Sequence, residues 1–257
     1  MIRADDIVSY LRERGHSPTT MWTRDIEACV VDHIAIPALA KRGGLSWTSD
    51  GAAFREWRGS VMIVPSRALS GMGAQKPATV AVVVENPRLA MVHVMQRWFA
   101  DVPTKVTVGD PVNVHPDAVI GCEGFAYELD GGHYERFPSV AGVVLGDGVD
   151  VAAGAVISRG CLTDTVIGDG TKVGHCVHVG RGARIGKHCL VAPGATVGGS
   201  AVIGDRVKVW MHASIGHGVR IGDGATIGMG AVVLSDVPPG ETWAGNPARC
   251  IRGRDGH

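Results

Sequence analysis

The sequence has little of several features that direct a protein towards particular functions. Only 5% of its 257 residues are aromatic, and its 25 basic side chains are balanced by 25 acidic ones. Without an excess of positive charge, attraction to nucleic acid or to an anionic membrane surface is not expected. The longest apolar runs, such as VAVVV at 80–84, are too short to span a bilayer. We therefore expect neither a nucleic-acid partner nor membrane insertion.

Cysteine pairs are also missing. The six cysteines are scattered with no CxxC spacing, which is typical of reduced thiols and offers no metal-ligand pattern. The first residues, MIRADDIVSYLRERG, carry charges every few positions and do not resemble a signal peptide. From these features we expect a cytoplasmic protein without a bound metal.

Glycine, by contrast, is abundant at 37 residues, and it accompanies a six-residue period. Val or Ile recurs every six residues from Ile167 to Val233, and glycine follows most of these positions. The same frame appears upstream at Val108, at Val114 and around Leu145. A fixed short period over this length is the signature of a solenoid.

This period predicts a left-handed parallel β-helix over residues 105–257. Each six-residue unit would form one short strand and one corner, so that three units make a triangular coil with the aliphatic residue inside. Glycine after the aliphatic residue is expected to permit a corner conformation that a Cβ atom would crowd. An open parallel sheet would need crossover helices, and no helical pattern fits 145–235.

The first 104 residues follow a different pattern, which predicts a small α/β domain. Residues 5–14 have helical spacing, 61–64 and 79–85 read as buried strands, and 66–78 reads as a loop. Asn86-Pro87 then predicts a helix that runs to Phe99. We therefore expect a domain boundary near residue 104.

Two interruptions of the six-residue frame are candidates for functional loops, because loops on a regular scaffold tend to carry function. The first is a long insertion at 121–144, and the second is SRGCLTDTV after Ile157.

Three segments resemble the N-acyltransferase family of lipid A biosynthesis, which acylates UDP-3-O-(3-hydroxyacyl)glucosamine. They are IGCEGFAYELDGGHYERFPSVAGVVLGD (120–147), VISRGCLTDTVIGDGTKV (156–173) and VVVENPRLAMVHVMQRWF (82–99). The resemblance implies a homotrimer with active sites between β-helices, an activated acyl donor and a nucleotide-linked amino sugar as acceptor. It also implies that the first domain binds the nucleotide, with Trp47, Asp50 and Phe54 in LSWTSDGAAFREW as the counterpart of a uridine-gripping segment.

The sequence departs from this family at two places. The position of the family's general-base histidine is Arg181 here, in VGRGARIG (179–186). The ending SDVPPGETWAGNPARCIRG (235–253) resembles that of coenzyme A-dependent hexapeptide acetyltransferases. This ending favours a short acyl-CoA donor over an acyl carrier protein.

Formation of an amide from a thioester needs a positioned amine, a base and donors for the developing oxyanion, but no covalent nucleophile. The candidates for catalysis are His175, His178, Arg181 and His217. His217 follows Arg181 by 36 residues, which is two coils, so both are expected on one edge of the prism. Arg181 could also bind a carboxylate or phosphate.

Further candidates surround these residues. His133 and Tyr134 of the insertion could reach the acceptor, and Lys208, Arg220, Trp243, Asn246 and Arg249 could hold the coenzyme.

Two alternatives stay open. HASIGHGVRIGDGATIGMGAVVL (212–234) is also similar to γ-class carbonic anhydrases, in which case His212 and His217 would bind zinc across a subunit interface. The change to Arg181 is also compatible with a non-catalytic scaffold that binds nucleotide sugars.

Overall fold

A computed structural model describes residues 2–21, 30, 31, 33, 34, 44–48, 59–69 and 80–253. The chain forms two compact units. The first comprises Met1–Val102 together with Ala126–Pro138, and the second comprises Pro103–Phe125 together with Ser139–His257.

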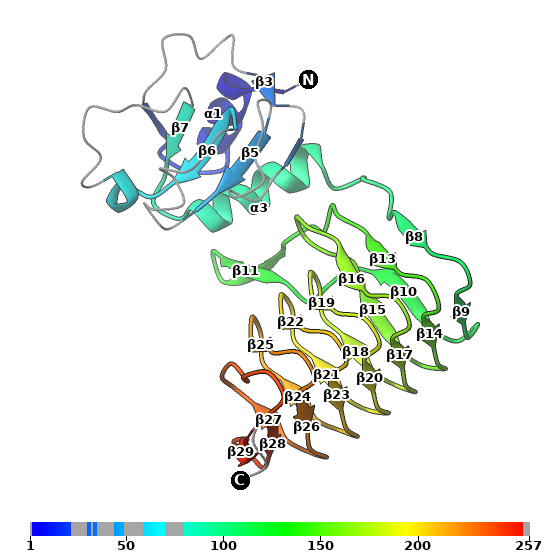
Figure 1. Ribbon diagram of the computed structural model, residues 1–257. Coiled ribbons are helices and arrows are strands. Elements are labelled where there is room, and N and C mark those ends of the chain that lie inside the picture. Colours follow the sequence, from blue (N-terminus) through cyan, green and yellow to red (C-terminus); the bar gives the residue numbers. More distant parts are fainter. Residues whose placement is uncertain are drawn as a thin grey trace. The chain divides into compact units, whose positions relative to one another are not determined.

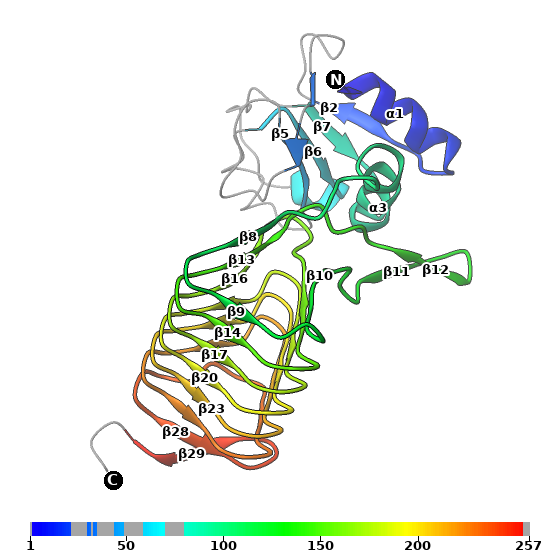
Figure 2. The same ribbon diagram turned by 90° about the vertical axis from the view of Figure 1, so that its right-hand side faces the viewer.

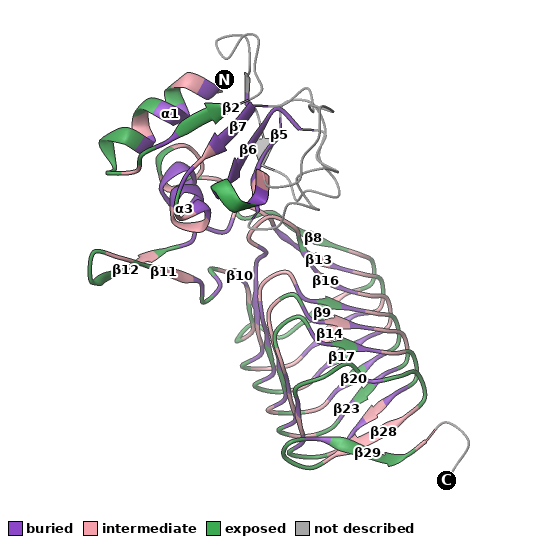
Figure 3. Ribbon diagram, turned by 90° about the vertical axis from the view of Figure 1, so that its left-hand side faces the viewer, coloured by how far each residue is buried: buried purple, intermediate pink, exposed green. Residues whose placement is uncertain are grey.

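The first unit contains a five-stranded sheet in the order β2-β7-β6-β5-β4. Its strands are β2 (Thr19–Met21), β4 (His33–Ile34), β5 (Gly44–Trp47), β6 (Val61–Val64) and β7 (Val80–Val83). The strands β4 to β7 run parallel, and β2 pairs with β7 antiparallel. A separate antiparallel pair joins β1 (Ile2–Arg3) to β3 (Val30–Val31). All four residues of β6 are buried (Figure 3), as expected for an apolar strand inside a parallel sheet.

Two helices and a 3₁₀ turn accompany these strands among the described residues of the first unit. They are α1 (Ala4–Glu13), α3 (Pro87–Trp98) and η2 (Ser66–Leu69). The side chain of Asn86 accepts a hydrogen bond from the amide of Leu89 at 3.1 Å, and Pro87 occupies the first turn of α3. The predicted helices and strands are thus confirmed, while η2 lies in a segment predicted to be a loop. No described helix has the length and apolar character needed to cross a membrane.

Part of the long insertion forms an antiparallel hairpin that is counted with the first unit. Its strands are β11 (Tyr127–Asp130) and β12 (His133–Arg136), and Asp130 pairs with His133. The connecting glycines have φ values of +52° at Gly131 and +93° at Gly132, which only glycine adopts at little cost. The Gly-Gly pair therefore fixes a two-residue turn.

The second unit is a β-helix with three parallel sheets, and a further strand ends one of them (Figures 1 and 2). Sheet order is β8-β13-β16-β19-β22-β25 on the first face, β9-β14-β17-β20-β23-β26-β28-β29 on the second and β10-β15-β18-β21-β24-β27 on the third. These will be called the first, second and third sheets.

The strands of the first sheet are Val106–Val108, Val143–Leu145, Thr165–Ile167, Arg184–Ile185, Val202–Ile203 and Arg220–Ile221, in chain order. Those of the second are Asn113–Val114, Asp150–Val151, Lys172–Val173, Leu190–Val191, Lys208–Val209, Thr226–Ile227, Thr242–Ala244 and Arg249–Arg252. Those of the third are Val119–Cys122, Val156–Ser158, His178–Val179, Thr196–Val197, Ser214–Ile215 and Val232–Val233.

The aliphatic residue of each repeat stacks on its equivalent in the next coil. Ile167 pairs in register with Ile185, and Ile185 pairs with Ile203. From Ile167 to Val233 each member of the six-residue series is at most 2% exposed. The predicted solenoid with parallel strands is confirmed, because burial of this column is what the period requires.

Glycine has two separate roles at the corners of the β-helix. The role predicted for the glycine directly after the aliphatic residue, to permit the corner conformation, is wrong. The left-handed conformation lies three residues after the aliphatic residue, at Gly170 (φ +69°) and even at His188 and His212 (φ +55° and +56°). From Ile167 to Val233, no glycine directly after the aliphatic residue has a positive φ. A Cβ atom added at Gly168 would instead lie 2.6 Å from the carbonyl carbon of Gly186 in the next coil. Close approach of neighbouring coils requires glycine at this position.

An ion pair between the buried Arg159 and the exposed Glu123 fixes the start of the insertion within the second unit. The guanidinium of Arg159, which is 5% exposed, bonds to Glu123 and, at 3.0 Å, to the hydroxyl of Thr104. The other carboxylate oxygen of Glu123 accepts from the amide of Ser139 at 3.2 Å. These contacts join both ends of the insertion to the β-helix.

Candidate functional site

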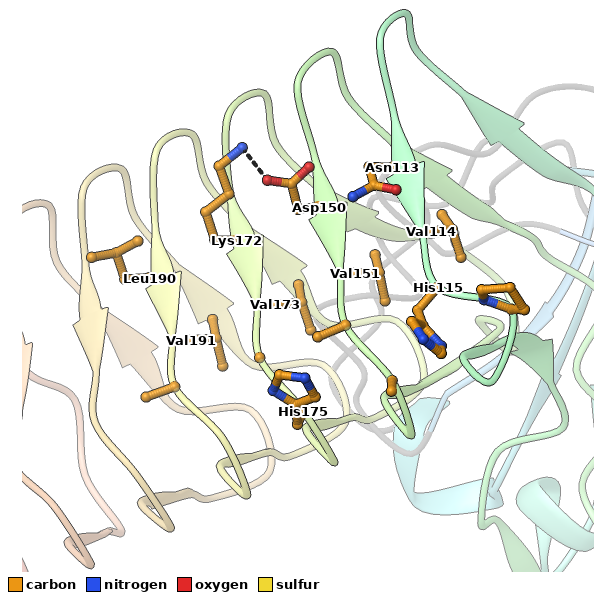
Figure 4. Close-up of a pocket in the computed structure, with 15 residues that line it drawn as sticks. Asn113, Val114, His115, Asp150, Val151, Lys172, Val173, His175, Leu190 and Val191 are labelled. Carbon is orange, nitrogen blue, oxygen red and sulfur yellow. Dashed lines mark ion pairs between the residues drawn. The ribbon is translucent and has the colours of Figure 1, made fainter.

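An open groove of about 590 Å³ runs across the second sheet of the β-helix (Figure 4). The strands β9, β14, β17 and β20 form its floor through their backbone, because Val151, Val173 and Val191 point into the core and are at most 2% exposed. His115 and His175 lie along one side, and Asn113, Asp150 and Lys172 lie along the other. The ammonium of Lys172 pairs with Asp150 at 2.6 Å. A groove with polar side chains along both of its sides is a candidate small-molecule site.

The two histidines of the groove differ in their hydrogen bonds. The amide of Asp117 donates to Nδ1 of His115 at 3.1 Å. In the neutral ring the proton of His115 is therefore on Nε2, which makes Nε2 a hydrogen-bond donor. The imidazole of His175 is exposed, and none of the described residues forms a hydrogen bond with it. His175 is thus available as a base and His115 as a donor.

The structure places the other predicted catalytic residues on other parts of the prism. His178 lies in β18 of the third sheet, between Val156 and Thr196. Arg181 and His217 follow the third-sheet strands β18 and β24, so they lie at the next corner. Within one chain the four candidates therefore do not share a face.

Arg181 and His217 do share an edge, as the count of six predicted. Between them lies Gly199, where an added Cβ would be 3.3 Å from Nδ1 of His217 and 3.5 Å from Cγ of Arg181. On the other side the side chain of Arg181 lies against Gly124, where an added Cβ would be 2.8 Å from Cδ of Arg181. The insertion thus begins directly over the position that the resemblance assigns to the base.

The residues predicted to bind the acceptor belong to the first unit. Trp47 is half-buried at the end of β5, while Asp50 and Phe54 lie outside the described residues. His133 and Tyr134 are exposed at the start of β12, and the ring of Tyr134 packs edge-on against Tyr127 at a centroid distance of 6.4 Å.

The residues predicted to hold the coenzyme occupy two sheets. Lys208 is exposed in β23, and Arg220 is exposed in β25 of the first sheet. Trp243 pairs with Ile227, so it continues the inward column and packs against the core, with its indole N–H donating to Glu241 at 2.7 Å. Asn246 is exposed beyond it, and the guanidinium of Arg249 bonds to the carbonyl of Ala248 at 2.8 Å.

The two histidines of the zinc alternative lie at different corners. His212 follows β23 of the second sheet, and its ring covers Gly194, where an added Cβ would be 2.4 Å from Nδ1. His217 follows β24 of the third sheet. Among the described residues, no group of three potential metal ligands includes either histidine. A zinc site with these residues would need a second chain.

The repeats of the β-helix match models of known protein families. Residues 164–199 and 200–235 each match the bacterial transferase hexapeptide family (six repeats), and residues 138–159 match the hexapeptide repeat of succinyl-transferase. The resemblance to hexapeptide-repeat acyltransferases predicted from the sequence is therefore confirmed.

Two named relatives match more than half of this chain. Over 149 residues the chain is 37% identical to UDP-3-O-acylglucosamine N-acyltransferase of Methylorubrum extorquens strain PA1, and 36% identical to that of Methylorubrum populi. The match covers 58% of this chain and 42% of each relative, so the chain spans about two fifths of their length.

Solved structures agree on the fold. UDP-N-acetylglucosamine O-acyltransferase of Moraxella catarrhalis RH4 aligns with a TM-score of 0.52 at 17% identity, over 88% of this chain and 72% of that one. The structure of LpxA from Acinetobacter baumannii aligns with a TM-score of 0.53 at 16% identity, over 87% of this chain and 74% of that one. At this identity the likeness concerns the fold alone.

Proposed function

We propose that the protein transfers an acyl group from an acyl-CoA thioester to the amino group of a nucleotide-linked sugar. The observation that carries the proposal is the identity of 37% over 149 residues with enzymes named UDP-3-O-acylglucosamine N-acyltransferase. We further propose a cytoplasmic homotrimer of left-handed β-helices, in which the groove on the second sheet faces a neighbouring subunit.

The groove offers the two groups that this reaction uses. His175 accepts the proton of the attacking amine, whose nitrogen forms a bond to the thioester carbonyl carbon. Nε2–H of His115 donates to the carbonyl oxygen as it gains negative charge. The carbon–sulfur bond then breaks, and the departing sulfur leaves as a thiol with the proton that His175 returns. The products are an amide and free coenzyme A.

The residues predicted to bind the coenzyme and the acceptor keep these roles in the proposal. Lys208, Arg220 and Arg249 would pair with coenzyme phosphates, near Trp243 and Asn246 of the closing segment. Trp47, Asp50 and Phe54 would hold the nucleotide, and His133 with Tyr134 would contact the sugar. The tail at 235–253, with its similarity to coenzyme A-dependent enzymes, favours a short acyl group.

A thiol-release assay tests the proposal. The protein is incubated with acetyl-CoA or a longer acyl-CoA and a panel of UDP- and dTDP-linked amino sugars, and free coenzyme A is titrated with a chromogenic disulfide. We expect release that depends on one amino sugar, and mass spectrometry of the product should show the added acyl group. Release with no member of the panel, or only with aminoglycosides or amino acids, would refute the nucleotide-sugar acceptor.

A direct measurement separates the non-catalytic alternative. A scaffold would be stabilised thermally by a nucleotide sugar, because a ligand that binds only the folded state raises its stability, yet it would release no coenzyme A. Hydration of carbon dioxide by the zinc-loaded protein would instead favour the reading based on His212 and His217.

A further inference from the structure

A cluster of imidazole and charged side chains joins two elements of the first unit. His93 belongs to α3, while Asp130 and Glu135 belong to the β11–β12 hairpin. One ring nitrogen of His93 and one carboxylate oxygen from each acid all lie within 4.8 Å of one another. The side chain of His93 is only 1% exposed. A buried imidazole beside two carboxylates is a set of ligands suited to a divalent ion.

The shortest separation in the cluster already fits coordination. Nε2 of His93 and Oδ2 of Asp130 are 3.3 Å apart. Two tetrahedral ligands that each lie about 2.0–2.1 Å from a zinc ion are separated by roughly 3.3 Å. Glu135 would need only a side-chain rotation to complete a set of three.

The hydrogen bonds of His93 leave an acceptor facing an acceptor. The guanidinium of Arg14 donates to Nε2 of His93 at 3.0 Å, so in the neutral ring Nε2 carries the lone pair and Nδ1 carries the proton. The Nδ1–H group of His93 then donates a hydrogen bond to Nε2 of His16, at 3.0 Å. The carboxylate of Asp130 then faces the lone pair of His93 with no proton between them. A cation between the two atoms would turn this repulsion into coordination.

Two outer partners hold the ligands in the forms that bind metal. Gln96 donates to Oε2 of Glu135 at 2.8 Å, which leaves Oε1 directed into the cluster. This hydrogen bond lowers the pKa of Glu135 and keeps it ionised. Burial, and after it the charge of Arg14, lowers the pKa of His93 and keeps its ring neutral. Support of a ligating imidazole through its second nitrogen, here by His16, is usual in metal sites.

Arg14 is the cation that competes for the same place. Its NH2 group lies 3.0 Å from Nε2 of His93, 3.4 Å from Oε1 of Glu135 and 4.0 Å from Oδ2 of Asp130. The Arg14 side chain is 38% exposed, so it can turn into solvent. A half-exposed ion pair contributes little stability in water, whereas three converging ligands gain much from a divalent ion. An available ion should therefore displace the guanidinium.

We propose that His93, Asp130 and Glu135 bind a divalent transition-metal ion, with Zn²⁺ as the best-suited ion, and that this ion replaces Arg14. His133, whose Nε2 lies 3.3 Å from Oε1 of Glu135, is placed to add a fourth ligand. The ion fastens the insertion hairpin to α3. This site does not depend on the proposed acyl transfer, and its test uses no activity measurement.

Metal titrations of the full chain test the site. The protein is stripped with a chelator and titrated with Zn²⁺ by calorimetry and with Co²⁺ by visible absorption. We expect one ion per chain at this site, with micromolar affinity or better. Glu135→Gln, a change on a surface hairpin, should weaken binding at least tenfold, as should His93→Ala. His188→Ala, at a corner of the β-helix, is the matched control and should bind like the original protein.

The response to Arg14 distinguishes a metal site from a simple ion-pair cluster. Arg14→Gln removes the competing cation, so the variant should bind Zn²⁺ at least as tightly as the original protein, and Zn²⁺ should raise its melting temperature. If Arg14→Gln abolishes binding, or if Glu135→Gln and His93→Ala bind zinc as the original protein does, the proposal is wrong.

Discussion

At the scale of single residues, the groove assigns different tasks to two histidines. His115 has its Nδ1 occupied by the amide of Asp117 and so presents a donor, whereas His175 has no such constraint. We expect His175→Ala to lower kcat by about 10²–10⁴-fold, the usual contribution of a general base. His115→Ala should lower kcat by about 10²–10³-fold, and His115→Gln should recover part of it because the amide N–H can still donate.

The comparison of the glutamine variants at the two positions distinguishes the proposed base from the proposed hydrogen-bond donor. His175→Gln should remain as slow as His175→Ala, because an amide cannot accept the proton of the amine. Steady-state kinetics with saturating acyl-CoA measure this, with His188→Ala as a control outside the groove. Equal rescue at both positions, or unchanged kcat in both alanine variants, would place the chemistry elsewhere.

The sequence predicted part of this site. Counting in sixes placed Arg181 and His217 on one edge, and the glycine between them confirms that register. The count could not separate the histidines by function, because the orientation of a ring depends on contacts such as the one from Asp117. His115 was missed, although it directly follows Val114 of the repeat series. The signal available in the sequence was this place directly after a repeat position.

At the scale of elements, the corners of the β-helix distinguish crowding from backbone strain. Gly204 directly follows an aliphatic residue, and an added Cβ would be 2.8 Å from the amide nitrogen of Asp223. Gly224 has φ +68° but open space around a Cβ. Alanine at Gly224 should cost about 1–2 kcal/mol, the penalty for the left-handed conformation. Alanine at Gly204 should cost more, because the backbone of the next coil must move.

Thermal unfolding of the two variants checks this order. Gly204→Ala should lower the melting temperature more than Gly224→Ala, and Gly224→Asn should be milder still, since asparagine tolerates this conformation. The corner residues His188 and His212, which already have positive φ, show that side chains are accepted there. A larger loss at Gly224 would reverse our assignment of the two glycine roles.

The hairpin was harder to predict than the β-helix. Gly131-Gly132 between two runs of four residues was a usable turn signal, yet the contacts that hold the hairpin are long-range. His93 is far from Asp130 and Glu135 in the sequence, and the three side chains come together only in the folded chain. This is why the sequence indicated no metal site, whereas the geometry proposes one.

At the scale of the whole molecule, local repetition explains why one half of the fold was readable. Each coil of the β-helix contacts its neighbours in the same register, so a short period determines strands, core and corners together. The first unit has no such repetition. Its strands were predicted from apolar runs, but the order of its sheet and its association with residues 126–138 depend on tertiary contacts.

The apolar surface of the second sheet supports the proposed trimer. Leu190 is 43% exposed in β20 of the sheet that carries the groove, and Trp210, which directly follows β23 of that sheet, is 41% exposed. Exposed large apolar side chains beside a candidate site indicate a surface that another subunit covers. We therefore expect light scattering to give three times the chain mass of 26.8 kDa.

A single charge should then break the assembly. Trp210→Glu places a carboxylate in the proposed interface, and burial of an unpaired charge is costly. The variant should scatter as a single chain and lose acyl transfer, because the groove would no longer face a neighbour. Arg206→Glu, at an exposed corner, should remain trimeric and active. A single-chain mass for the original protein, or a trimeric and active Trp210→Glu variant, would contradict an active site shared between subunits.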